Sequence, residues 1–110
     1  MALAAWGLDQ TDIDAAELVI AELVANAVRH AAGPALRIIV ERPGTDRVYV
    51  AVVDRAPRRL PARRAPGLEE TAGRGLLLVD AYALRWGWDI LGDITRPWGK
   101  RVWALLETHP

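Results

Sequence analysis

The sequence contains no cysteine and no phenylalanine, and lysine occurs only once. Without cysteine, the chain can form neither a disulfide framework nor a thiolate-based catalytic or zinc site. Thirteen of the 14 basic residues are arginine, and they balance 14 acidic residues, so the formal net charge is zero. This balance disfavours binding to nucleic acid or to an anionic membrane through bulk electrostatics.

Long hydrophobic runs are also absent. No stretch approaches the roughly 18 apolar residues that suggest a membrane-spanning helix. The segment Met1–Trp6 lacks the basic and apolar regions of a signal peptide. We therefore expect a cytoplasmic protein that does not associate with membranes. The 110 residues, of which 52% are hydrophobic and 25% charged, predict one globular domain over residues 1–110.

Apolar periodicity and turn residues predict the elements. A first helix is expected over residues 11–31, with Thr11 as its cap, and a second from Leu76 to about Leu84. Four strands are expected, over residues 35–42, 47–53, 85–91 and 100–107. Turns at 43–46 and 92–99 connect them in pairs. This order predicts an α+β fold, a two-layer sandwich with helices on one face of a mixed, mostly antiparallel sheet.

The first predicted helix carries two polar residues in an otherwise apolar stretch. Glu22 and Asn26 are four residues apart and therefore lie on one helix face, which Arg29 and His30 continue. This stripe has two interpretations. It is either a solvent-facing side of the helix or the floor of a ligand site, in which a carboxylate, an amide and a guanidinium meet a metal or a phosphate.

Two further segments are candidate sites. Asp54 ends an apolar strand, where a carboxylate serves either as a turn former or as an acceptor for an exocyclic amine. Gly73-Arg74-Gly75 directly precedes a helix, where backbone N–H groups and the helix dipole favour an anion, although glycines there also form plain turns. Between these segments, five arginines lie in the ten residues from Arg55 to Arg64. The whole segment from Asp54 to Gly73 is a loop of about 20 residues, which in a compact domain usually means a lid, a binding loop or a wrong assignment of the elements.

Together these segments resemble the histidine-kinase-like ATPase domain, the GHKL or Bergerat ATP-binding fold. The resemblance rests on four segments: ELVANAVRH (22–30), VVD (52–54), GRGLLLVDAYALRWGW (73–88) and GKRVWALL (99–106). It is strongest to the small stand-alone anti-sigma regulatory factors, which are serine/threonine kinases. It implies ATP and Mg²⁺ as cofactors, with a sigma factor and an anti-sigma antagonist protein as partners. A homodimer is also compatible with it, and direct contact with nucleic acid is not expected.

The resemblance also implies roles for the residues of the first helix. Asn26 matches the asparagine that coordinates Mg²⁺. Glu22 matches the acidic residue regarded as the general base. Arg29 and His30 match positions that approach the phosphates and the nucleotide. These four residues would therefore form the catalytic and metal-binding side of the site.

The remaining matches concern the base and the phosphates. Asp54 matches the aspartate that accepts a hydrogen bond from the adenine amine. Gly73, Arg74 and Gly75 match the second glycine box beside the phosphates. Residues 55–72 would form the ATP lid.

The sequence departs from the family pattern in two places. Asp54 is followed by Arg55-Ala56-Pro57, without the glycines of the usual box, and the first strand of the family fold is absent. These departures leave an alternative function open, a non-catalytic protein-interaction module that keeps the ATPase fold. A nucleic-acid binder built on the arginine-rich loop is disfavoured by the zero net charge.

Overall fold

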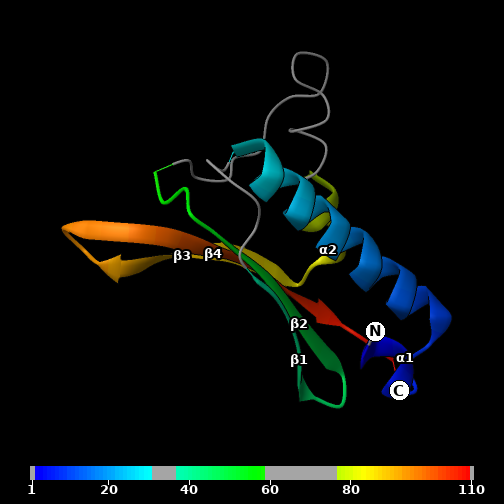
Figure 1. Ribbon diagram of the computed structural model, residues 1–110. Coiled ribbons are helices and arrows are strands. Elements are labelled where there is room, and N and C mark those ends of the chain that lie inside the picture. Colours follow the sequence, from blue (N-terminus) through cyan, green and yellow to red (C-terminus); the bar gives the residue numbers. More distant parts are fainter. Residues whose placement is uncertain (1, 31–36, 59–76, 110) are drawn as a thin grey trace.

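The computed structural model describes residues 2–30, 37–58 and 77–109 (Figure 1). In chain order its elements are α1 (Ala2–Ala5), α2 (Gln10–His30), β1 (Arg37–Gly44), β2 (Arg47–Asp54), a helical segment over 77–82, β3 (Arg85–Asp93) and β4 (Arg96–Glu107). The strands form one sheet in the order β1-β2-β4-β3, and every pairing among these described strands is antiparallel. The expected α+β architecture is confirmed.

Helix α2 begins one residue earlier than predicted, and its cap is not the expected one. The carboxylate of Asp9 accepts a hydrogen bond from the backbone N–H of Thr11 at 2.7 Å. The carbonyl oxygen of Asp9 accepts the first helical bond, from Ile13, at 3.0 Å. Asp9 is therefore the N-cap, and the prediction of Thr11 was wrong because a capping carboxylate bonds the second residue after it.

One face of α2 packs against the sheet. Its buried side chains recur every three or four residues, which is the period of a single helix face: Asp12, Ala16, Val19, Ile20, Leu23, Asn26 and Ala27. Leu3 of α1 and Val79 of the 77–82 segment join the same core. The described helices thus contribute to one hydrophobic core.

The sheet side of the core comes from alternate residues of the two central strands. Val48, Val50 and Val52 of β2 are almost fully buried. The antiparallel register sets Val50 opposite Ala104 and Val52 opposite Val102 of β4. Because side chains alternate across a sheet, these residues all face α2. Asp54 follows in the same alternating row of β2, at the edge of this core.

Strands β3 and β4 form a hairpin that is longer than predicted. Residues 92–99 were expected to be a turn region, but only Ile94 and Thr95 form the turn. The Asp93 carboxylate accepts hydrogen bonds from the backbone N–H and the hydroxyl of Thr95 at 2.9 and 2.8 Å. Gly92 takes a positive φ of 98° beside Trp98. The hairpin therefore extends past the rest of the sheet (Figure 1).

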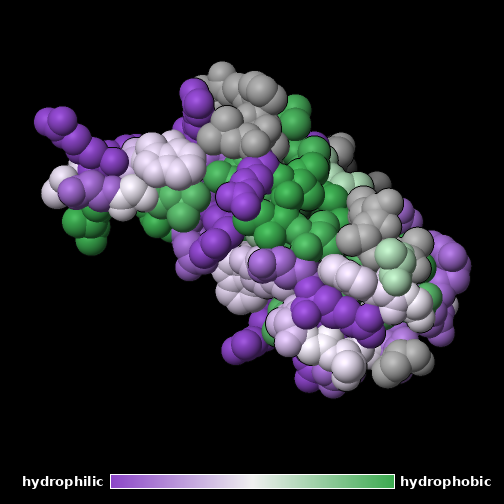
Figure 2. Space-filling model, turned by 60° about the horizontal axis from the view of Figure 1, so that its bottom comes forward, coloured by the Kyte–Doolittle hydropathy of each residue, from purple (hydrophilic) through white to green (hydrophobic). Residues whose placement is uncertain are grey.

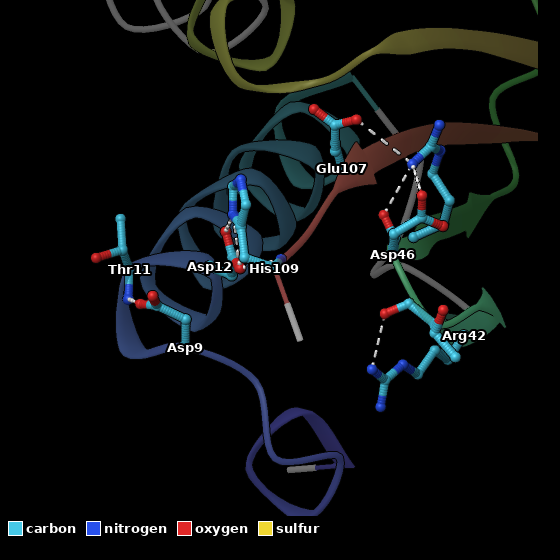
Figure 3. A network of polar contacts seen from close by, with 9 residues as sticks. Asp9, Thr11, Asp12, Arg42, Asp46, Glu107 and His109 are labelled. Carbon is cyan, nitrogen blue, oxygen red and sulfur yellow. Dashed lines mark hydrogen bonds and ion pairs between the residues drawn. The ribbon is translucent and has the colours of Figure 1, made fainter.

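A polar network closes the end of the molecule at which α2 begins (Figure 3). The buried carboxylate of Asp12 accepts the backbone N–H of His109 at 2.6 Å. Arg47 pairs with Asp46 at 2.8 Å and with Glu107 at 3.5 Å. The Asp12 contact attaches the C-terminal residues to the first turn of α2, and the Arg47 contacts join the ends of β2 and β4.

The other face of the sheet carries Tyr49 stacked on Trp103, with ring centroids 6.2 Å apart. An open groove of about 450 Å³ lies on this face, lined by Arg37, Ile39, Glu41, Pro43, Tyr49, Arg101 and Leu105. Figure 2 shows how hydrophobic and hydrophilic side chains lie next to one another on one side of the molecule. No helix in the described ranges combines the length and the apolar character needed to cross a bilayer.

Candidate functional site

Two segments that the sequence singled out run toward the same end of the molecule. Helix α2 packs on β2, and the two elements run in the same direction (Figure 1). Asn26 therefore lies near the end of α2, and Asp54 lies at the end of β2. This end is opposite the polar network around Asp12.

Asn26 is the most unusual polar residue at this end. Its side chain is buried, with 2% of its surface exposed. Among the residues that the structure describes, neither its amide nitrogen nor its amide oxygen has a hydrogen-bond partner. A buried amide without partners costs about 1–3 kcal/mol, and each such group in a folded protein needs an explanation. The solvent-facing interpretation of the polar stripe is therefore wrong for Asn26, which faces inward.

Glu22 and Arg29 lie on the flank of the same helix. Glu22 is half-buried and Arg29 is exposed. Neither takes part in an ion pair with another side chain of the described ranges. Both charged groups are therefore open to a ligand on this flank, one helical turn to either side of Asn26.

Asp54 is in a different state. Its side chain is completely buried, and so is that of Lys100 on β4, which lies directly opposite in the strand register. The Lys100 ammonium donates to both carboxylate oxygens, at 3.0 and 2.9 Å. The backbone N–H of Ala56 also donates to this carboxylate, at 2.7 Å. Asp54 is thus held in a buried ion pair.

Lys100 has no role in the sequence-based hypothesis. Two signals could have identified it. It is the only lysine of the chain, and it heads an alternating row of buried residues, Val102, Ala104 and Leu106. A charged residue in such a row predicts a buried partner, because an unpaired charge would be too costly in the core.

Gly99, the neighbour of Lys100, allows the two strands to approach. A Cβ atom at Gly99 would overlap the backbone carbonyl oxygen of Asp54. Glycine is therefore required here by close backbone contact. This contact fixes the spacing at which Lys100 reaches Asp54.

Several predicted site residues lie outside what the structure describes. Gly73, Arg74, Gly75 and residues 59–72 of the expected lid fall in a range that is not described. The backbone of His30 ends α2, but its side chain is likewise not described. Their predicted roles stay predictions.

The described residues fit the Mg²⁺ and phosphates of a bound nucleotide but not its base. An unpaired amide oxygen is a suitable ligand for Mg²⁺, which commonly takes one or two protein ligands and completes its shell with phosphates and water. In the described ranges, no three histidine, cysteine, aspartate or glutamate side chains gather as a metal site. Asn26 fits the metal and phosphate end, whereas the paired carboxylate of Asp54 does not fit an acceptor for an amine.

The match to known families settles the class of this domain. Residues 1–89 match the profile of the histidine kinase-like ATPase domain. The chain belongs to this family. No curated protein and no solved structure matches the chain. Asn26 and Lys100 therefore belong to a histidine kinase-like ATPase domain.

Proposed function

We propose that this histidine kinase-like ATPase domain binds ATP with Mg²⁺ and phosphorylates a serine of an anti-sigma antagonist protein in the cytoplasm. The observation that carries the proposal is the buried amide of Asn26 near the end of α2, which has no partner within residues 2–30, 37–58 and 77–109. Glu22 and Arg29 beside it, which pair with no other described side chain, would supply the charges that phosphoryl transfer needs. The anti-sigma assignment itself rests on the sequence resemblance.

Each of these residues would have a distinct task. The amide oxygen of Asn26 would bind Mg²⁺, and the Arg29 guanidinium would offset phosphate charge. The Glu22 carboxylate would accept the serine proton as the hydroxyl oxygen bonds to the γ-phosphorus and the bond to the bridging oxygen breaks. Bound Mg²⁺-ATP would supply the phosphoryl group and part of the charge neutralisation. Positioning and electrostatics would thus provide most of the catalysis.

Transfer of labelled phosphate from ATP to an antagonist protein tests the proposal. The control is the same antagonist with its acceptor serine changed to alanine. We expect Glu22→Gln to lower the transfer rate by about 10²–10⁴-fold, the usual contribution of a general base, while nucleotide binding persists. Nucleotide binding without any transfer by the natural chain would reject the kinase.

The non-catalytic interaction module is the second candidate. The ion pair between Asp54 and Lys100 favours it, because this pair occupies the carboxylate expected to recognise adenine. A ligand that binds only the folded state raises its stability, by about 2.7 kcal/mol at a hundred times the dissociation constant. A melting temperature that saturating Mg²⁺-ATP leaves unchanged would favour the module over the kinase.

A further inference from the structure

The chain's only lysine is fully buried against the carboxylate at the end of β2. Both side chains of the pair, Lys100 and Asp54, have no exposed surface. Lysine is rarely buried in proteins unless it is paired. The pair lies beside the candidate nucleotide site and can therefore affect what that site binds.

The hydrogen bonds of the Lys100 ammonium are complete. An ammonium group has three donors. Here they meet the two carboxylate oxygens of Asp54 and the carbonyl oxygen of Ala56, the last at 2.9 Å. The carboxylate also accepts the Ala56 N–H. Lys100, Asp54 and Ala56 thus satisfy one another without a ligand.

This closed set changes what the site offers to a purine base. The amine of adenine is a donor and needs a free acceptor. The Asp54 carboxylate is enclosed and already accepts three hydrogen bonds. Separating a buried ion pair is costly, because it leaves an uncompensated charge. One hydrogen bond from an amine is too little to displace Lys100.

The pair does not involve Asn26, which is proposed to bind Mg²⁺ and the phosphates. Asn26, with its unpaired amide, belongs to α2, whereas the pair joins β2 to β4. Binding through the phosphates and Mg²⁺ is therefore compatible with a closed pair, and recognition of the base through Asp54 is not.

We propose that Lys100 prevents Asp54 from recognising the base. This chain therefore binds nucleoside triphosphates through their phosphates, with little selection for the base. This inference rests on the proposed nucleotide binding. It differs from the role of Asp54 that the resemblance implies, since Asp54 here is a partner of Lys100 and not an acceptor for adenine.

Calorimetric titration of the natural chain with Mg²⁺-ATP and Mg²⁺-GTP tests the inference without any variant. We expect the two dissociation constants to differ by less than about fivefold, which is below the value of one hydrogen bond to a charged acceptor. A preference for ATP above fivefold would overturn the inference and leave the proposed function intact. Failure to bind either nucleotide would overturn both.

Variants of the pair give a second, independent measurement. Lys100→Met keeps an unbranched apolar stem one atom shorter than lysine and frees the Asp54 carboxylate, so we expect a preference for ATP of about tenfold or more to appear. Asp54→Asn combined with Lys100→Met removes both charges and avoids an unpaired buried carboxylate, so it provides a folded comparison if the single variant unfolds. In this double variant we expect no base preference. A ratio of the two dissociation constants in folded Lys100→Met that equals that of the natural chain would contradict the role of Lys100, and so would a preference for ATP above about fivefold in the double variant.

Arg101→Met is the matched control. Arg101 is the next residue of β4, points to the other face of the sheet and is partly exposed. Its replacement also removes one positive charge. The ratio of the two dissociation constants should remain that of the natural chain.

Discussion

Two buried polar residues at one end of the molecule stand in opposite states. Asn26 has no partner for either atom of its amide in the described part of the chain, whereas Asp54 has its charge matched by Lys100 and its oxygens hydrogen-bonded. An unpaired buried group is a cost that a ligand can remove, and a paired one resists a ligand. In the proposed site, a ligand would therefore meet an unpaired amide at Asn26 and a paired carboxylate at Asp54.

The close approach of Gly99 to Asp54 predicts a loss of stability on substitution. In Gly99→Ala the new methyl group must displace the Asp54 backbone, so we expect the free energy of unfolding to fall by about 1–3 kcal/mol, the usual cost of overpacking. Denaturant unfolding measures it. Gly44→Ala is the control, because a Cβ there meets only the Asp46 carboxylate at an ordinary 3.6 Å. Equal effects of the two substitutions would contradict the geometry.

Tyr49 provides a prediction about pH. Burial raises the pKa of its phenol above the ordinary value, and Arg101 nearby opposes this while Asp89 and Glu41 reinforce it. The folded state therefore favours the neutral phenol. Its contribution to stability is present below about pH 10, the unfolded pKa of tyrosine, and is lost as the pH rises through the folded pKa.

Phenolate absorbance, titrated in the natural chain and in Tyr49→Phe, isolates this group, because the chain has only two tyrosines. The difference between the two titrations should have its midpoint above pH 10, the ordinary tyrosine value. A midpoint below that value would show that Tyr49 is not desolvated in the folded state.

At the scale of the element, the sequence and the structure assign different N-cap residues to α2. The sequence favours Thr11 as the cap, and the structure assigns Asp9. Asp9→Ala should lower the free energy of unfolding by about 1 kcal/mol, the typical value of an N-cap. Thr11→Ala, at an exposed position, should change it by less than about 0.5 kcal/mol. Thermal unfolding of the two variants decides between the caps, and a larger effect at Thr11 would favour the sequence-based assignment.

The β3–β4 hairpin shows why element boundaries were harder to predict than the elements themselves. Gly92, Pro97 and Gly99 are residues typical of turns, so residues 92–99 were interpreted as one. In the structure Gly92 accommodates a bulge and Gly99 a close strand contact. The glycines correctly marked positions of unusual backbone geometry. They did not mark a turn, because their roles depend on the strand that each one pairs with.

At the scale of the whole molecule, the sequence was sufficient for the class of fold and for the family. The order of predicted helices and strands indicated the two layers, and the resemblance predicted the ATPase domain that the family match confirms. The inward orientation of Asn26 required the packing of α2 on the sheet. The partnership of Lys100 with Asp54 required the register between strands that are far apart in sequence.

The central claim is that the Asn26 amide binds Mg²⁺ together with a nucleotide. Calorimetric titration with ATP, with and without Mg²⁺, tests it on the natural chain and on Asn26→Leu. Leucine has nearly the same shape and removes the unpaired amide, so this variant should fold and be more stable by about 1–3 kcal/mol. The Glu22→Gln variant, which keeps Asn26, is the binding control.

We predict that Mg²⁺ strengthens ATP binding to the natural chain and to Glu22→Gln, and that Asn26→Leu loses this dependence on Mg²⁺ while its melting temperature rises. Binding of Mg²⁺-ATP to Asn26→Leu with the affinity of the natural chain would contradict the account.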